Sequence, residues 1–291
     1  MRDFYGKDPS YRKADMTINY LGYWTDNGAT YFWNTEPHKS YEQTIYDRFW
    51  NDLFKESKLW GLTVYEQDFM SVNTDTINAT VSDVYSGKSW LMDMGNAARM
   101  NGLTIQYCMG YPRHVMTALE IPVVTQGRVL FDNRPSSDHW TIGVSSLFAE
   151  AMGIAPYKDD FWSMEVQPGN GYSKYLHTSD LTEPHTAIHG AISTLSTGPV
   201  GPSDQVGNSN VSLIMRCCNT EGLILKPSKP ITAIDKQIQQ MAFGGNVGPE
   251  GKVYTTYSNI NNYIFGVILA ANISIDYTLM VQDTGINMVI F

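Results

Sequence analysis

The sequence predicts an α/β protein whose parallel sheet is wound either open or as a barrel, followed by a small antiparallel β region. Three observations support this prediction. Short apolar runs alternate with amphipathic helical segments through the middle of the chain. The connections between these segments are short, as parallel strand-helix units require. After about Lys226 the pattern changes, and strand-like runs follow one another at the C-terminal end.

Helices are predicted from apolar periodicity and from residues typical of helix ends. In the segment 40–61, apolar residues recur near one face, Ser40 can cap the start and Gly61 can end the helix. A second helix is predicted over 75–100, just before Asn101 and Gly102. Further helices are predicted over 113–121, 139–153 and 185–197.

Strands are predicted where short apolar runs lie between these helices. One starts at Leu62 and ends where Glu66 and Asp68 arrive. The other predicted strands are Ile18–Trp24, 103–109, 122–131, 252–259, 262–273 and 277–283. This order divides the chain into an N-terminal extension over 1–17, an α/β domain over 18–235 and a partial C-terminal β domain over 236–291.

Composition narrows the classes of function. The chain has 291 residues, a net charge of −9 and 12% aromatic residues, so it is acidic and rich in rings. An acidic protein repels nucleic acid and anionic membrane, so neither is an expected partner. No signal peptide or membrane-spanning run is predicted, and the compartment stays open. The three cysteines show no zinc-site spacing.

Polar side chains follow the predicted strands. Glu66 and Asp68 are two residues apart, so on a strand they face the same side. Ligands of parallel α/β folds bind at the carboxyl ends of the strands, which makes these residues candidates for a site. The other candidates found in this way are Trp24, Asp26, Cys108, Arg128, Asp132, Asp159 and Asp204, and Asp160 stands beside Asp159.

This rim suits the hydrolysis of a glycosidic bond. Such a reaction needs two carboxyl groups on opposite sides of the bond, and aromatic rings offer a flat surface to a sugar. Carboxylates also bind Mg²⁺ or Ca²⁺, but no D-x-D-x-D-G loop is present and no histidine accompanies the pairs. No metal ligand and no other cofactor is therefore predicted. A metal-dependent hydrolase that uses the same carboxylates remains an alternative.

Each candidate also has a purely structural interpretation. Glu66 and Asp68 can be a solvated strand end, and Arg128 with Asp132 a surface ion pair. Cys108 and Trp24 suit core packing. Asp159 suits helix capping and Asp204 a turn beside Pro202 and Ser203. The histidines show no catalytic spacing and are interpreted as structural or exposed.

Ordered motifs over roughly residues 20–235 carry a resemblance. Arg128 opens a short motif with Asp132 that ends in proline, and a helix and a Pro-Asp-Phe-Ser pattern follow it. The later motifs are Ser203-Asp204 and the acidic turn Glu221-Gly222-Leu223, and Trp24 and Asp26 stand in the segment "LGYWTDNGA". This set resembles raffinose synthase and α-galactosidase-like proteins of glycoside hydrolase family 36.

The resemblance implies a (β/α)₈ TIM-type barrel over 18–235 and a retaining α-glycoside hydrolase or transglycosylase with an α-galactoside-type substrate. Asp68 would be the nucleophile and Asp132 the general acid/base, its pKa raised by burial and a nearby carboxylate. The substrate-binding residues would be Trp24, Asp26, Glu66, Cys108, Arg128, Asp159 and Asp204. The oligomeric state stays open.

Two departures from the family pattern set the alternatives. Glu66 stands where the family has a lysine, which places a like charge beside Asp68. Only one strand-helix unit fits between Trp24 and Asp68, so two barrel strands are predicted to be missing. The alternative interpretation is a catalytically inactive glycan-binding homologue or a truncated fragment.

Overall fold

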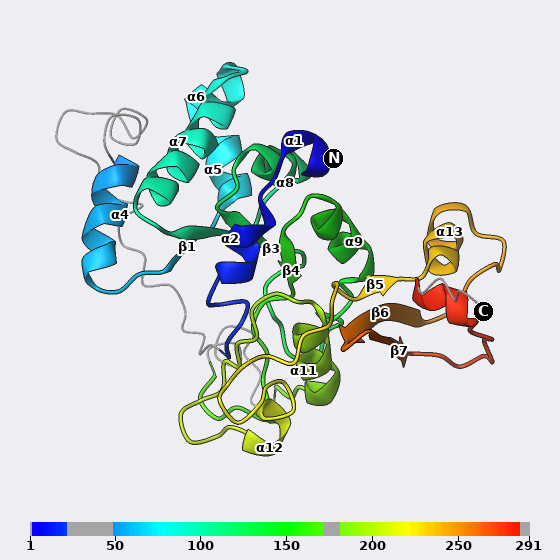
Figure 1. Ribbon diagram of the computed structural model, residues 1–291. Helices are drawn as coiled ribbons and strands as arrows, with labels where there is room; N and C mark the ends of the chain where they lie inside the picture. The colour runs from blue at the N-terminus through cyan, green and yellow to red at the C-terminus, as the bar shows by residue number, and fades with distance from the viewer. Residues whose placement is uncertain (1, 22–48, 171–180, 286–291) are drawn as a thin grey trace. The chain divides into compact units, whose positions relative to one another are not determined.

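A computed structural model describes residues 2–21, 49–170 and 181–285, which form a mixed α/β fold (Figure 1). The parallel sheet has the strand order β1-β2-β3-β4 and the antiparallel sheet the order β5-β6-β7. These strands are β1 (Val64–Gln67), β2 (Thr104–Tyr107), β3 (Val124–Arg128), β4 (Ala155–Tyr157), β5 (Thr232–Ala233), β6 (Lys252–Ile260) and β7 (Tyr263–Ala271). The predicted α/β class and the antiparallel C-terminal region are confirmed. The described residues contribute four strands to the parallel sheet, so an eight-stranded barrel stays a prediction.

Contacts group the described chain into two compact units. Unit 1 holds residues 2–19, 49–128 and 151–154, and unit 2 holds 20–21, 129–150, 155–170 and 181–285. Each unit is described by itself.

Unit 1 contains the first three parallel strands. Val64 of β1 pairs with Thr104 of β2, and Ile105 of β2 pairs with Val124 of β3. The helices are α1 (Arg2–Tyr5), α2 (Pro9–Ala14), α4 (Trp50–Leu59), α5 (Met70–Thr76), α6 (Asn78–Ser82), α7 (Ser86–Met100), α8 (Pro112–Thr117) and the 3₁₀ turn η3 (Ala118–Glu120). An aromatic group joins α4 and β1, where the rings of Phe54 and Tyr65 lie 5.0 Å apart between centroids. Both rings are buried and add apolar contact area to the core of the unit.

The single helix predicted over 75–100 is wrong. The segment holds the end of α5, all of α6 and all of α7. Ile77 and Asp83 interrupt it in extended conformations, with ψ values of 119° and 132°. Asp83 then accepts a 2.7 Å bond from the Ser86 backbone N–H, which satisfies a donor at the start of α7. Local capping therefore overrides the helical periodicity.

The N-terminal segment packs on unit 1 through two polar side chains. Lys7 Nζ donates to three carbonyl oxygens, those of Ala118 at 2.5 Å, Ile121 at 3.2 Å and Val124 at 2.9 Å. Asp15 is buried, and its Oδ2 accepts from Thr104, Thr125 and Gln126. These bonds fix the segment on strands β2 and β3.

Unit 2 contains β4 and the antiparallel sheet. Val129, which directly follows β3, donates from its N–H to the carbonyl of Tyr157 in β4 at 3.0 Å. Beyond β4, Phe161 bridges Pro202 in a parallel sense, so the segment near Pro202 continues the parallel winding. The helices are α9 (Gly143–Ala151), α11 (Thr186–Leu195), α12 (Val211–Ile214), α13 (Asp235–Phe243) and the 3₁₀ turn η4 (Val281–Thr284).

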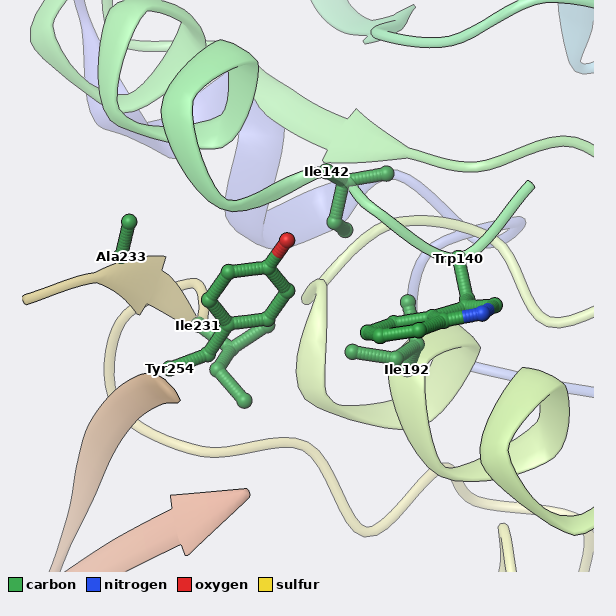
Figure 2. Close-up of a cluster of buried hydrophobic side chains, with 6 residues drawn as sticks. All are labelled: Trp140, Ile142, Ile192, Ile231, Ala233 and Tyr254. Carbon is green, nitrogen blue, oxygen red and sulfur yellow. The ribbon is translucent and has the colours of Figure 1, made fainter. Parts of the chain in front are cut away.

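Six buried side chains form the main core of unit 2 (Figure 2). They are Trp140, Ile142, Ile192, Ile231, Ala233 and Tyr254. Trp140 and Tyr254 face one another with ring centroids 6.3 Å apart. Gly143 lies directly against the Tyr254 ring, because a Cβ there would sit 2.3 Å from Tyr254 Cε1. The core thus joins α11, β5 and β6 to the start of α9.

Two predictions at the ends of the chain differ from the structure. The strand predicted over 277–283 is wrong, because Val281–Thr284 form η4 and the Asp283 side chain accepts from the Met280 N–H at 2.8 Å. In the strand predicted over 18–24, Tyr20 forms one isolated antiparallel bridge to Leu223. Ile18 and Asn19 lie in a turn, so the predicted strand is not formed there, and residues 22–24 lie outside the described residues.

Candidate functional site

Glu66 and Asp68 lie on one side of the carboxyl end of β1. Tyr65 and Gln67 are buried on the opposite side and joined by a 3.2 Å bond from Tyr65 Oη to Gln67 Oε1. Glu66 and Asp68 are each partly exposed. The predicted alternation at this strand end is confirmed.

The backbone turns sharply just after Asp68. Phe69 has a φ of 53°, a left-handed conformation that side chains with a Cβ seldom adopt. Asp68 Oδ1 accepts from the Phe69 N–H at 2.7 Å, and Gln67 Nε2 donates to the Asp68 carbonyl at 2.8 Å. These bonds hold Asp68 at the point where β1 gives way to α5.

Four of the predicted site residues gather at the carboxyl ends of β1, β2 and β3. Cys108 follows β2, and its N–H donates to the Gln67 carbonyl at 2.9 Å. Burial raises the pKa of the Cys108 thiol, the Arg128 charge opposes this, and the charges of Glu66 and Asp68 add to it. These mutual influences place Cys108, Arg128, Glu66 and Asp68 in one electrostatic neighbourhood. A thiol of raised pKa is protonated at neutral pH, so Cys108 is a packing and hydrogen-bonding group.

In unit 2, a charged group follows β4. Lys158 is fully buried, and its Nζ donates to the carbonyl of Asp160. Burial lowers the pKa of Lys158 to about 8, and the charges of Asp160, Asp159 and Glu183 oppose this. Lys158 thus brings a positive charge close to Asp159 and Asp160 in the loop after β4.

Asp159 connects this loop to the loop that follows β3. Its Oδ2 accepts from the Asn133 N–H at 2.7 Å. Asp159 has a φ of 92°, so its backbone is strained, which is common at functional sites. Asp132 precedes Asn133 and is exposed, so its predicted burial is wrong. Asn133 turns into the protein while its neighbour faces solvent.

Asp160 is the carboxyl of this group that resembles a proton donor. Burial raises its pKa to about 7, and the Asp159 charge adds to the shift. The Lys158 charge and hydrogen bonds with Ser203 and Asn133 oppose it. By surface area the residue Asp160 is partly buried, and these groups surround its carboxyl. A carboxyl in this state can donate a proton near neutral pH.

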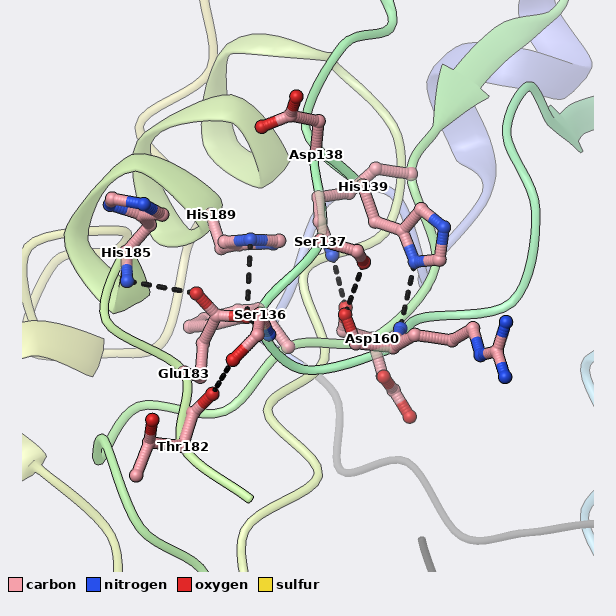
Figure 3. A network of polar contacts seen from close by, with 12 residues as sticks. Ser136, Ser137, Asp138, His139, Asp160, Thr182, Glu183, His185 and His189 are labelled. Atoms are coloured by element: carbon pink, nitrogen blue, oxygen red, sulfur yellow. Dashed lines mark hydrogen bonds and ion pairs between the residues drawn. The ribbon is translucent and has the colours of Figure 1, made fainter. Parts of the chain in front are cut away.

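Glu183 and His189 form a buried pair beside this group (Figure 3). Glu183 accepts from the backbone N–H groups of Ser136 at 3.1 Å and His185 at 2.8 Å. His189 Nε2 lies 3.6 Å from Glu183 Oε2, which is too long for a hydrogen bond. Burial lowers the pKa of His189 to about 2, so the ring is neutral and the contact is not an ion pair.

His139 completes the group from the loop after β3 (Figure 3). Its Nδ1 accepts from the Arg134 N–H at 2.7 Å. Burial lowers its pKa, the charges of Lys158 and Arg134 act in the same direction, and those of Asp159 and Asp132 oppose them. The imidazole of His139 is therefore neutral when it accepts this bond and fixes the loop.

Asp204 is used within the fold. It is buried, and its two carboxylate oxygens accept from the N–H and Oγ of Ser163 at 2.7 and 2.5 Å. Gln167 Nε2 donates to the same carboxylate at 2.6 Å. Asp204 therefore fixes the chain beyond β4, and the turn interpretation from the sequence omits this role.

The site contains residues that the sequence did not predict, and two predicted residues lie outside the described part of the chain. The predicted site set lacks Lys158, Asp160, Glu183, His139 and His189, although Asp160 stands beside Asp159 at the same predicted strand end. The adjacent letters Lys-Asp-Asp after an apolar run were the available signal for the first two. Trp24 and Asp26, the predicted sugar-holding pair, lie outside the described residues.

No family model and no curated protein matches the chain. In the part of the chain that the structure describes, no three His, Cys, Asp or Glu side chains are grouped so that they could hold a metal ion. Within the same residues, no helix is long and apolar enough to cross a membrane.

Proposed function

We propose that the chain is a retaining α-glycoside hydrolase or transglycosylase, with an α-galactoside-type substrate, built on a (β/α)₈ TIM-type barrel. The observation that supports this best is the gathering of Glu66, Asp68, Cys108 and Arg128 at the carboxyl ends of β1, β2 and β3. A guanidinium and carboxylates are the groups that bind sugar hydroxyls, and this strand edge is where barrel enzymes place them.

Asp68 is the proposed nucleophile. Its carboxylate attacks the anomeric carbon, the bond to the leaving oxygen breaks, and a glycosyl ester forms. Water or a second sugar then attacks the same carbon and releases Asp68, which retains the configuration. Arg128 donates to a hydroxyl of the sugar, and Glu66 accepts from one.

Two residues of unit 2 are candidates for the proton donor. The motif resemblance assigns Asp132, which is exposed. The environment favours Asp160, because its raised pKa of about 7 keeps the carboxyl partly protonated at neutral pH. Lys158 and Asp159 adjust this pKa in opposite directions.

The nucleophile is tested by Asp68→Ala. We expect kcat on an aryl α-galactoside to fall roughly 10³-fold or more, with azide restoring turnover and giving a β-glycosyl azide. Asp52→Ala, at an exposed aspartate of α4, is the matched control and should keep wild-type turnover. Unchanged turnover of the Asp68 variant would refute its role.

The proton donor is tested by Asp132→Asn and Asp160→Asn, with the exposed Asp138→Asn of the same region as control. Loss of the donor should slow an alkyl galactoside by roughly 10²-fold or more and spare a dinitrophenyl galactoside, whose leaving group needs no proton. The donor is the aspartate whose replacement slows the alkyl galactoside and spares the dinitrophenyl galactoside. If neither variant shows this difference, the acid/base assignment fails.

Glu66 favours a second candidate, a glycan-binding protein without turnover. It stands where the resembling family has a lysine, which would donate to sugar hydroxyls. In that case galactose raises the melting temperature of the wild-type chain. When a panel of aryl α-glycosides is assayed, no product then appears with any of them. Turnover that Asp68→Ala abolishes would exclude this candidate.

A further inference from the structure

Strand β7 is an edge strand that exposes apolar side chains. Tyr263, Ile264, Phe265 and Ile268 are 72%, 52%, 54% and 47% exposed. In the sheet order β5-β6-β7, β6 is its partner on one side, and no described strand pairs with its other side. Natural edge strands are protected by charges or proline, but none stands between Asn261 and Asn272.

The hairpin that carries β7 has a fixed register. Asn261 and Asn262 have φ values of 50° and 71°, the left-handed pair of a two-residue type I′ turn. The pairs run without a bulge from Ile260↔Tyr263 to Lys252↔Ala271. A regular strand of nine residues is therefore presented along its whole length.

The backbone groups at the free edge follow from the bonds of β6. Three residues of β6 make backbone bonds on the side away from β7. The Val253 N–H donates to Gln237 Oε1 and its carbonyl accepts from the Ile234 N–H. The Tyr257 carbonyl accepts from the Ser228 N–H, and the Asn259 N–H donates to Ser228 Oγ. The intervening residues of β6 therefore bond to β7, through Tyr263 and every second residue after it. The N–H and C=O groups of Ile264, Gly266, Ile268 and Ala270 consequently face the free edge.

We propose that a second copy of this chain pairs with β7 in antiparallel fashion, about a two-fold axis at Val267. This register overlaps all nine residues of both strands and joins outward-facing residues to each other, Ile264 to Ala270 and Gly266 to Ile268. The dimer extends each three-stranded sheet into one sheet shared by both copies.

The side chains of β7 are complementary to themselves in this register. Three pairs join a large residue to a small one: Tyr263 meets Ala271, Ile264 meets Ala270, and Ile268 meets Gly266. The other pairs are apolar, because Phe265 meets Leu269 and Val267 meets its own copy. Uncharged strands also meet without like-charge repulsion. These two features favour a second copy over a charged partner, and a closed two-fold pair consumes both free edges.

Sedimentation velocity over a hundredfold range of concentration tests the proposal. We expect a dimer for the wild type and a monomer for Ile264→Lys/Ile268→Lys, because two ammonium groups per strand oppose pairing. Val206→Lys/Phe243→Lys adds the same charge at residues 86% and 88% exposed in the same unit and should remain dimeric. Thermal unfolding is measured at a dilution at which the dimer dissociates. A cooperative transition of each variant at the melting temperature of the wild type shows that the variant folds.

The register is tested by Val267→Cys. Two copies of this residue would form a non-hydrogen-bonded pair with Cα atoms about 4.5 Å apart, which suits a disulfide. Mild oxidation should cross-link this variant into a dimer, whereas Ile260→Cys, 55% exposed on β6, should not cross-link. A monomeric wild type, a dimer insensitive to the β7 charges, or open-ended aggregates in place of a dimer would each overturn the proposal.

Discussion

Ser163 and Asp204 make a two-point contact across 41 residues of sequence. Ser163 donates from its backbone N–H to Asp204 Oδ1 at 2.7 Å and from its Oγ to Oδ2 at 2.5 Å. Ser163 Oγ also accepts from the Asn210 N–H at 2.7 Å. The contact joins the chain beyond β4 to the segment before α12.

Asp204→Ala should destabilise the protein by about 3 kcal/mol, because it leaves the buried donors of Ser163 and Gln167 without an acceptor. Ser163→Ala removes the Oγ that donates to Asp204 and accepts from Asn210, and it should cost about 2 kcal/mol. Urea unfolding measures both values. An Asp204→Ala variant as stable as the wild type would contradict the structural role and return Asp204 to the substrate-binding set.

Acid should weaken unit 1 through His114. Its Nδ1 accepts from the Tyr111 N–H at 3.0 Å, and its Nε2 lies 2.9 Å from Thr74 Oγ1. Thr74 Oγ1 already donates to the Met70 carbonyl, so the assigned tautomer carries its proton on Nε2. Burial lowers the pKa of His114 from 6.5 to about 4.

The unfolded chain therefore binds a proton at a higher pH than the folded chain, and stability falls as pH decreases from about 6.5 to about 4. The loss should be about 2 kcal/mol. His114→Gln keeps the donor to Thr74 but does not titrate, so its stability should change less over this range. Parallel pH profiles of the two proteins would show that His114 is not the group responsible.

Asp160 should act in the opposite direction. Its folded pKa of about 7 exceeds its ordinary value of 3.8, so the folded state holds the proton more tightly. Its contribution to stability is present below about pH 4 and is lost as the pH rises to about 7. Asp160→Asn should gain about 2 kcal/mol relative to the wild type across that interval. Asp138→Asn should follow the wild-type profile in the same unfolding experiment.

Gly198 should not tolerate a side chain. A Cβ there would lie 2.3 Å from the Pro156 carbonyl oxygen and 2.6 Å from Tyr157 Cβ, so β4 would have to move. Gly198→Ala should cost about 1–3 kcal/mol in thermal unfolding. Gly87→Ala is the matched control, because nothing lies within 4 Å of its Cβ in α7, and it should gain about 0.5 kcal/mol. Equal effects of the two substitutions would contradict the close approach.

Local patterns predicted the parts of the fold that depend on neighbours in sequence. The period of two at β1 placed Glu66 and Asp68 on one side, and the strand pattern of β6 and β7 located the hairpin. The same patterns failed over 75–100, because Asp83 caps a new helix there, and over 277–283, where a side-chain bond to Met280 N–H favours a 3₁₀ turn.

The sequence by itself determined the α/β class, the antiparallel C-terminal hairpin, and the polar residues at the strand ends. Only the tertiary structure decided which carboxyl groups are enclosed and which are exposed. Asp132 and Asp160 are both aspartates after strands, yet Asp160 is surrounded by Lys158, Asp159 and Ser203 whereas Asp132 faces solvent. Lys158 and Asp159 are neighbours in sequence, but the burial of the Asp160 carboxyl and its contacts with Ser203 and Asn133 come from residues distant in sequence, which a local pattern does not encode.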